Sequence, residues 1–467
     1  MNINQGIKCV VCGSKINVRM QAGGRSKNDI RFACPKCQIP INIVIEFKRR
    51  KFERKDNFDI KILEEELRMD RELFEYSIEN AEFLNEFEDA DYSVQCSSEF
   101  FTSKNIFNPF NQIRDKKNIN EVPFEAFTPF IQARRFFNEN DLMAFEEHCS
   151  RIYSCIDDSN IFERLNSLYL NKSEYFLSHI NEVFKDIKGE VEYKGDDILN
   201  LKCIYDFNIR YFNSFLKRGE FSNINTKILR DIYSVKESNN SEFNRMLSYF
   251  YKERYLDEYE QRIIKIIDTY IKKFKYLVPA IAVEYLRSDI SKEEVYDKYT
   301  MRTCTFEDIK DIYLEVYENV IEIYSLFIAL NNIMYRTKYD SFSQLKELPG
   351  IPKKIANNKK LMIKNFDDFQ LLNKGIKLYY MCNDEEFNKY MPKLERFLRN
   401  SLGHGSWHYN NINQMINYRT NEVNGAEIHL LKYANECYKI FPKLVYIYKI
   451  IIDMKMNYLK NNLEDFD

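Results

Sequence analysis

Four cysteines near the N-terminus have the spacing of a metal site. They form two C-x2-C pairs, Cys9 with Cys12 and Cys34 with Cys37. One C-x2-C turn lets two thiolates reach the same ion, and a second turn completes a tetrahedral shell of four sulfurs. The spacing therefore predicts one structural Zn²⁺. Because such a closed shell has no open position for water, we expect no catalysis at the metal.

The remaining cysteines indicate the redox state of the compartment in which the protein is expected. The chain has 11 cysteines, and those outside the two pairs are solitary, which suits a reducing compartment and not a disulfide scaffold. The N-terminus has no apolar signal region, and the longest apolar stretch, Tyr276–Leu286, is shorter than the roughly 20 residues that a bilayer requires. We therefore expect a soluble cytoplasmic protein with no membrane partner.

Short β-rich runs surround the second cysteine pair. Ile16–Met20 and Ile39–Phe47 are rich in β-branched residues and predict strands. With the two cysteine pairs, this segment resembles the zinc ribbon family. Two roles stay open for it. The metal could serve only to fold a segment too small for a core of its own, or the ribbon and the basic cluster Lys48–Lys51 could also contact nucleic acid or a partner.

A second group of residues that could carry out chemistry lies in the C-terminal third. Arg399, Asn400 and His404 read R-N-x3-H at the end of an amphipathic run. An arginine offers a planar, permanently charged fork for phosphoryl oxygens, and histidine exchanges protons near neutral pH. If the helix end and the following turn converge, the two side chains can act on one phosphate.

This segment resembles the HEPN superfamily, whose ribonuclease members carry R-x4-6-H with a polar residue after the arginine. The resemblance covers about residues 300–460. It implies a metal-independent endoribonuclease with two protomers facing one cleft, hence a homodimer. In that case His404 would move a proton, Arg399 would hold the scissile phosphate, and Asn400 would orient the pair.

Other interpretations of the same segment remain open. Arg399 could instead pair with Glu395 one helical turn away, with His404 a passive loop residue. His408 could be a second proton carrier, although surface histidines of this kind are usually passive. The HEPN variant that works with a nucleotidyltransferase antitoxin carries H-x-Y, whereas Ser406 stands at the tyrosine position here.

A lysine-rich segment precedes this region. It follows LPGIP, which is similar to a helix-hairpin-helix turn in which Pro352 removes one of the amides that would bind phosphate. The lysines could steer RNA toward the helices, or form a solvated basic loop. The predicted RNA-binding residues are Lys353, Lys354, Lys359 and Lys360.

Length and composition set the fold class. Of 467 residues, 45% are apolar and 30% are charged, so the chain can form several cores. It has 33 Tyr and 36 Phe but only 12 Gly and 10 Pro, which favours long helices with aromatic cores. A formal net charge of −2 excludes a bulk polycation, so that any nucleic-acid contact must come from local patches.

Apolar periodicity predicts a mainly α, helical multi-domain chain with a small N-terminal β zinc ribbon and a C-terminal four-helix HEPN-like bundle. We expect exposed acidic helices within 52–91. The bundle helices are expected at 305–334, 366–381, 384–402 and 426–459, the last bent at Pro442. The expected domains are a zinc ribbon at 1–47, an acidic helical and irregular linker region at 48–128, a middle α-helical domain at 129–290 and the HEPN-like bundle at 300–467.

Two functional hypotheses follow. The first is an endoribonuclease of the HEPN type that cleaves RNA at a dimer interface, acts as a toxin or in antiviral defence against phages, and responds to a regulatory protein or phage-derived trigger. The second is a non-catalytic nucleic-acid-binding or protein-binding helical module with a zinc ribbon. The absence of GxxxxGK[ST], GxSxG and HExxH leaves nucleotide hydrolysis, serine hydrolysis and zincin chemistry without support.

Overall fold

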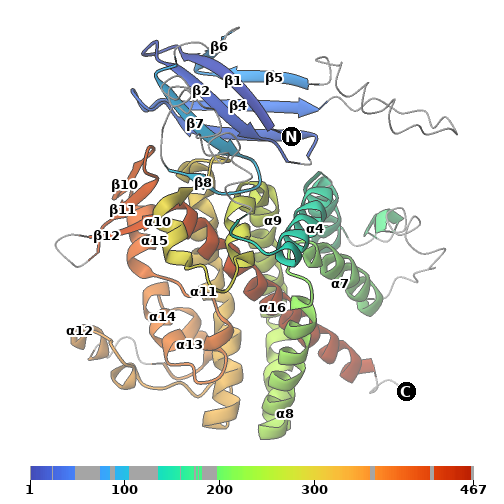
Figure 1. The fold of residues 1–467 in the computed structure, drawn as a ribbon. Helices are drawn as coiled ribbons and strands as arrows, with labels where there is room; N and C mark the ends of the chain where they lie inside the picture. The colour runs from blue at the N-terminus through green and yellow to red at the C-terminus, as the bar shows by residue number, and fades with distance from the viewer. Residues whose placement is uncertain are drawn as a thin grey trace, which may run out of the picture. The chain divides into compact units, whose positions relative to one another are not determined.

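The computed structural model describes most of the chain, and the prediction of a mainly helical protein is confirmed (Figure 1). Small sheets accompany the helices. The described residues are 2–23, 25–47, 74–84, 90–104, 135–157, 159–172, 175–176, 178–180, 197–357, 363–420 and 425–463. The basic cluster Lys48–Lys51 and the acidic residues 52–73 lie outside these ranges.

The chain forms two compact units, each built from separate stretches of sequence. Unit 1 comprises Met1–Tyr153, Lys275–Lys310 and Ser406–Tyr438, and unit 2 comprises Ser154–Phe274, Asp311–Gly405 and Lys439–Asp467. The boundaries of the four consecutive domains expected from the sequence remain a prediction.

Two sheets of unit 1 share one hydrophobic core. The first has the order β6-β1-β2-β7, in which β2 pairs antiparallel with β1 and parallel with β7. The second has the order β3-β4-β5. Ile7, Ile16 and Val18 from the first sheet pack with Ile30 and Ile43 from the second in a single buried cluster. The strands are β1 (Asn2–Cys9), β2 (Lys15–Gln21), β3 (Lys27–Ala33), β4 (Pro40–Phe47), β5 (Phe74–Glu79), β6 (Ala81–Phe83) and β7 (Tyr92–Ser97).

The strands expected at 16–20 and 39–47 are confirmed as β2 and β4. The helix expected within 52–91 is wrong for residues 74–83, which form β5 and β6. Phe74 and Ile78 are four residues apart, a spacing that fits one helical turn but equally fits two steps of a strand. The alternation in FEYSIE and antiparallel pairing with β4 favour the strand.

Two further small sheets belong to unit 1. One has the order β10-β11-β12. Strands β10 and β11 lie in the gap between the helices expected at 384–402 and 426–459, whereas β12 occupies 426–429, for which the helix prediction is wrong. The other pairs β8 with β9. Their bounds are β8 (Thr102–Ser103), β9 (Tyr299–Thr300), β10 (Trp407–Asn410), β11 (Met415–Tyr418) and β12 (Ala426–His429).

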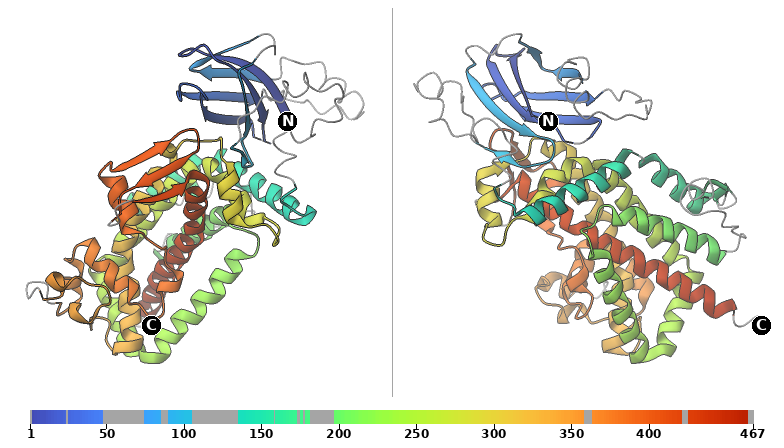
Figure 2. Two further views of the ribbon diagram at one scale, coloured as in Figure 1. Left: turned by 60° about the vertical axis from the view of Figure 1, so that its left-hand side comes forward. Right: turned by 45° about the vertical axis from the view of Figure 1, so that its right-hand side comes forward.

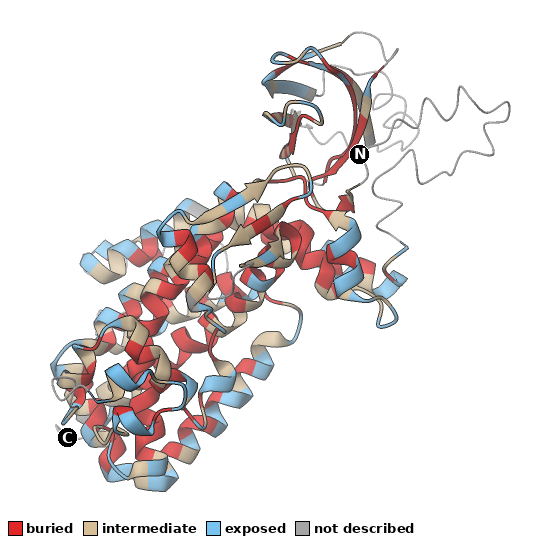
Figure 3. Ribbon diagram, turned by 90° about the vertical axis from the view of Figure 1, so that its left-hand side faces the viewer, coloured by how far each residue is buried: buried red, intermediate tan, exposed pale blue. Residues whose placement is uncertain are grey.

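Helices and the loops that connect them make up the rest of the described chain (Figure 2). In Figure 3 the long helices are buried along one side and exposed along the other, as their amphipathic sequences predict. The longer helices are α4 (Glu139–Asp157), α5 (Ser159–Asn171), α7 (Asp197–Asn213), α8 (Glu220–Lys252), α9 (Tyr255–Ile281), α11 (Phe306–Arg336) and α16 (Leu430–Leu463). The shorter ones are η4 (Ala282–Tyr285), α10 (Lys292–Lys298), η5 (Leu345–Glu347), α12 (Lys353–Ala356), α13 (Phe366–Gln370), α14 (Lys374–Cys382), η7 (Asn388–Tyr390) and α15 (Arg396–Gly403).

The C-terminal helices confirm the predictions only in part. Helix α11 matches the predicted 305–334, and its apolar stripe from Ile309 to Phe327 is buried. The predicted 366–381 is divided into α13 and α14, because the Asn373 side chain accepts from the Ile376 amide and starts a new helix. The prediction for 384–402 is wrong before Arg396, since Asp384 caps a turn at Phe387 and the chain stays non-helical through most of that stretch. The last helix, α16, begins at Leu430 and contains Pro442.

A buried polar contact joins three helices of unit 2. The side-chain amides of Asn166 on α5 and Asn208 on α7 exchange two hydrogen bonds of 3.0 and 2.8 Å. The Asn208 amide also donates to the hydroxyl of Tyr448 on α16 at 2.9 Å. All three side chains are buried, so each bond replaces one that water would have made. The contact fixes how α5, α7 and α16 pack.

Replacing Asn208 with leucine should destabilise unit 2. The substitution leaves the buried Oδ1 of Asn166 and the hydroxyl of Tyr448 without the Asn208 donor, while Nδ2 of Asn166 keeps its bond to the Phe162 carbonyl. The two lost bonds cost roughly 3 kcal/mol of unfolding free energy. Tyr448→Phe removes one hydroxyl and leaves the amide pair intact, so its cost should be about 1 kcal/mol. Urea unfolding followed by far-UV circular dichroism measures both values. Equal losses in the two variants would contradict the role given to the amide pair.

Candidate functional site

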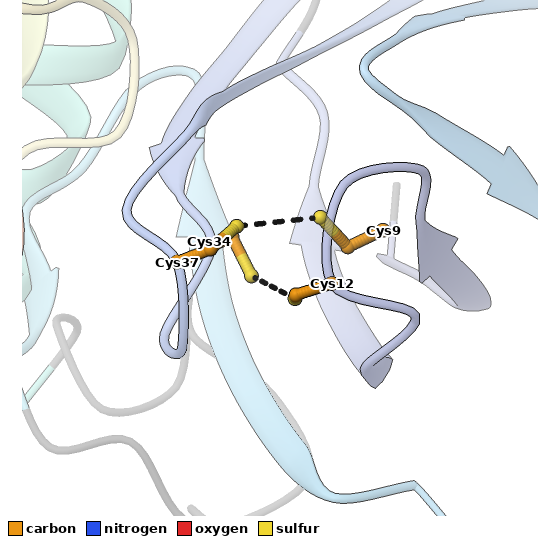
Figure 4. A group of neighbouring side chains, drawn as sticks. All are labelled: Cys9, Cys12, Cys34 and Cys37. Carbon is orange, nitrogen blue, oxygen red and sulfur yellow. Dashed lines mark hydrogen bonds between the residues drawn. The ribbon is translucent and has the colours of Figure 1, made fainter.

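The four N-terminal cysteines converge on one point, as their spacing predicts (Figure 4). Their sulfur atoms all lie within 4.8 Å of one another. The Sγ atoms of Cys9 and Cys37 are 3.6 Å apart, and those of Cys12 and Cys34 are also 3.6 Å apart. Four sulfurs placed about 2.3 Å from a central ion in a regular tetrahedron would be about 3.8 Å apart. The cluster therefore has the dimensions of a tetrahedral thiolate site and could hold one metal ion.

The two cysteine pairs occupy equivalent turns. The first connects β1 to β2 and the second connects β3 to β4. In the first turn the Gly13 amide donates to the Cys9 carbonyl at 2.9 Å, and in the second the Gln38 amide donates to the Cys34 carbonyl at 2.9 Å. Gly13 has φ of 71° and Gln38 has φ of 65°, so the residue after each second cysteine is left-handed. This conformation favours glycine, which the second turn lacks.

Protonation of the cysteines differs with their surroundings. A hydrogen bond with the Ser14 side chain lowers the pKa of the Cys12 thiol to about 6, whereas burial raises the pKa of Cys34 to about 12. A hydrogen bond with the Ile39 backbone lowers the pKa of Cys37, but burial and the hydrogen bonds with Cys12 and Cys9 outweigh it and raise the pKa. Four thiolates held this close repel one another, so the fully deprotonated set requires a cation at its centre.

A different group of side chains anchors Arg399 on α15. Its Nε and Nη2 atoms donate to Oε1 of Glu318 on α11, the Nε bond being 2.8 Å long, and its Nη1 donates to Oδ1 of Asn400 at 3.1 Å. The guanidinium carbon also lies 5.3 Å from the centre of the Tyr317 ring. These contacts fix the plane of a side chain that stays 29% exposed.

Glu318 serves two cations at once. Its Oε2 accepts from Nζ of Lys374 on α14 at 2.5 Å, while Oε1 accepts from Arg399. Burial opposes the ionisation of Glu318, but the hydrogen bonds from Lys374 and Arg399 outweigh it and hold its pKa below the usual range. One carboxylate against two cations leaves a net positive charge beside the end of α15.

His404 follows α15 directly. Its backbone amide donates to the Asn400 carbonyl at 3.0 Å and so closes the last turn of the helix. The side chain is exposed, and among the described residues none hydrogen-bonds the imidazole. Asn400 and His404 are one helical turn apart and therefore project from the same face. Asn400 also accepts a hydrogen bond from Arg399, so it lies between the arginine and the histidine.

In the structure, Arg399 does not form the ion pair considered with Glu395. Its ion-pair partner is Glu318, 81 positions earlier in the chain, whereas Glu395 contributes only its backbone carbonyl to the Arg399 amide. No local pattern in the sequence points to Glu318, Lys374 or Tyr317. Their contact with α15 depends on how α11, α14 and α15 pack, and spacing within one segment does not report that.

The other predicted residues lie apart from this contact set. Lys353 and Lys354 are exposed in α12, and Lys359 and Lys360 lie outside the described residues. His408 is exposed in β10, which belongs to unit 1.

Comparison with protein-family profiles, curated proteins and solved structures finds no match to this chain. Within the described residues, no helix is both long and apolar enough to cross a bilayer.

The cysteine cluster should carry one metal ion per chain. Cys37→Ser replaces a thiolate with a hydroxyl that is a poor ligand, so this variant should lose the metal. Elemental analysis by mass spectrometry of the purified full-length protein measures the stoichiometry. Cys382→Ser is the matched control, because Cys382 is a solitary exposed cysteine. Full metal content in Cys37→Ser, or equal loss in Cys382→Ser, would contradict the assignment.

Proposed function

We propose that the protein is a metal-independent endoribonuclease of the HEPN type, with Arg399, Asn400 and His404 as its catalytic residues. The observation that carries the proposal is the anchoring of Arg399 next to Asn400 at the end of α15, where His404 follows exposed. The cytoplasm is the proposed location, and RNA is the proposed substrate. A role in toxin action or phage defence, triggered by another protein, rests on the resemblance.

The anchored arginine keeps donors available for a phosphate. A guanidinium carries five N–H donors. Glu318 and Asn400 use one each on Nε, Nη2 and Nη1, so that one N–H on Nη1 and one on Nη2 are left. Two N–H groups at the end of the fork match two oxygens of a phosphate. The positive charge left by Arg399, Lys374 and Glu318 attracts the same group.

The chemistry requires one base and one acid. A base removes the proton of the ribose 2′-hydroxyl, whose oxygen attacks the adjacent phosphorus, while an acid gives a proton to the departing 5′-oxygen. The P–O5′ bond breaks as the new P–O2′ bond forms, giving a 2′,3′-cyclic phosphate and a 5′-hydroxyl. Arg399 offsets the charge on the phosphoryl oxygens.

One chain supplies a single histidine at this group of residues. His404 can act as base or as acid, but not as both within one cleavage step. A second copy of the chain brings the complementary histidine, the partner's His404. We therefore propose a homodimer whose two R-x4-H segments line one cleft.

The cysteine cluster has a structural role in this proposal. Four thiolates at tetrahedral spacing are the ligand set that zinc prefers, and a closed shell offers no position for substrate. Zn²⁺ therefore joins the two N-terminal turns, and cleavage depends on Arg399 and His404.

A non-catalytic nucleic-acid-binding or protein-binding module is the second candidate function. The observation that favours it is the pairing of Arg399 with Glu318, because a guanidinium held by a carboxylate can be purely structural. In such a module the helical region would mediate association, and the metal-bound β-strands would provide recognition.

Cleavage assays distinguish the two functions. The wild-type protein should cleave single-stranded RNA in the presence of EDTA and leave 2′,3′-cyclic phosphate ends. His404→Ala removes the proton carrier and should lower the rate about 100-fold or more. Arg399→Ala should lower it by a similar factor, because it removes charge stabilisation of the transition state.

His408→Ala is the matched control for that assay. His408 is exposed like His404 but lies in β10, so its loss should leave the rate unchanged. Cleavage that persists in His404→Ala, or that appears only with added Mg²⁺, would refute the mechanism. Absence of cleavage with retained RNA binding would favour the non-catalytic module.

Mixing experiments test the shared cleft. A threefold excess of His404→Ala chain should place most wild-type chains in mixed dimers that lack one histidine, so activity per wild-type chain should fall severalfold. The same excess of His408→Ala chain should raise total activity, since those chains are competent. An unchanged rate per wild-type chain with the His404→Ala excess would show that single chains act alone.

A further inference from the structure

Unit 2 contains a cavity at some distance in sequence from Arg399 and His404. It has a volume of about 370 Å³, which falls in the range of roughly 300–1,000 Å³ typical of small-molecule sites. Its walls come from α5, α7, the end of α8, the start of α9 and the last part of α16. Its polar lining residues are Tyr169, Asp197, Asn200, Tyr251, Arg254, Asp257, Glu260, Gln261 and Lys455.

A buried ion-pair group lies at one side of this cavity. Nζ of Lys455 is 2.6 Å from Oε2 of Glu260 and 2.7 Å from Oδ1 of Asp257. The side chain of Glu260 is only 1% exposed, so this carboxylate depends on Lys455 for compensation. Arg254 lies 3.5 Å from the other oxygen of Asp257. Both cations of the cavity therefore already face carboxylates.

Two acceptors of the cavity lack such compensation. Asn200 is 9% exposed, and its Oδ1 is buried with no hydrogen-bond partner in the described part of the chain. An unsatisfied buried carbonyl costs free energy unless an occupant of the cavity supplies a donor. Asp197, in the first turn of α7, is exposed and forms no ion pair with any described residue. Both groups can accept a hydrogen bond from a ligand, and the carboxylate of Asp197 favours a positively charged donor.

Two tyrosines also line the cavity. Tyr169, Asp257 and Glu260 line the same cavity. Burial, together with the carboxylates of Glu260 and Asp257, holds the pKa of the Tyr169 hydroxyl well above its usual value. The Tyr251 ring stacks on Tyr458 with centroids 3.9 Å apart, which holds it in place. The faces of tyrosine rings attract organic cations, and the rings also offer apolar contact.

The charge count then selects the ligand. Three carboxylates and two cations line the cavity and leave one negative charge uncompensated. We propose that this cavity binds a small organic cation with N–H donors, of the alkylamine class, whose ammonium groups meet Asp197 and Oδ1 of Asn200 beside Tyr169 and Tyr251. A phosphate would have to displace Glu260 or Asp257 from Lys455 and would add charge of the wrong sign.

Titration calorimetry on the full-length protein at low ionic strength tests the proposal. Spermidine is the cationic probe, 1,7-heptanediol a neutral chain of similar length, and inorganic phosphate the anionic probe. Spermidine should bind, and the other two should not. Asp197→Asn removes one charge and should weaken spermidine binding roughly fivefold. Asn200→Leu removes the acceptor and should weaken it about tenfold or more.

Two further variants test the proposal even if Asn200→Leu does not fold. Asn200→Asp retains the shape of the side chain and adds a negative charge, so it should tighten spermidine binding even if Asn200→Leu does not fold. Glu258→Gln is the matched control, since Glu258 is an exposed carboxylate of α9 that does not line the cavity. No binding of spermidine, equal weakening in Glu258→Gln, or preferential binding of phosphate or the diol would overturn the assignment.

Discussion

The contact of Glu318 with Arg399 and Lys374 is the interaction on which the proposed site depends. Glu318 lies on α11, Lys374 on α14 and Arg399 on α15, so one carboxylate connects α11 to two helices that come much later in the sequence. It fixes the guanidinium plane and leaves a net positive charge. Without Glu318, Arg399 would keep only its contacts with Asn400 and the Tyr317 ring, and the plane of its guanidinium would be less firmly fixed.

Much of the structure was predictable where the information is local. The spacing of Cys9, Cys12, Cys34 and Cys37 was sufficient because a C-x2-C turn is a short-range geometry that does not depend on the rest of the fold. The apolar stripe of α11 was sufficient because a long buried helix repeats its pattern over many turns. In both cases neighbours in sequence are also neighbours in space.

The predictions that were wrong concern residues whose structure depends on contacts distant in sequence. Residues 74–79 form a strand because β4 offers an antiparallel edge, which the segment itself does not reveal. The short α15 begins only after a capped turn at Asp384 and a non-helical run. Glu318 and Asn200 lie outside any motif, because their significance comes from helix packing. Tertiary contacts, not spacing, define those positions.

The two cysteine turns have a consequence for the order of folding. Each is the connection of an antiparallel hairpin, β1 with β2 and β3 with β4, and the hairpins belong to different sheets. Each hairpin can form from contacts close in sequence, which is fast, and each then presents half of the ligand set. An ion bound by all four sulfurs would require both halves, so its uptake would report that the two hairpins have met. Metal binding would then be a late step in the assembly of the shared β core.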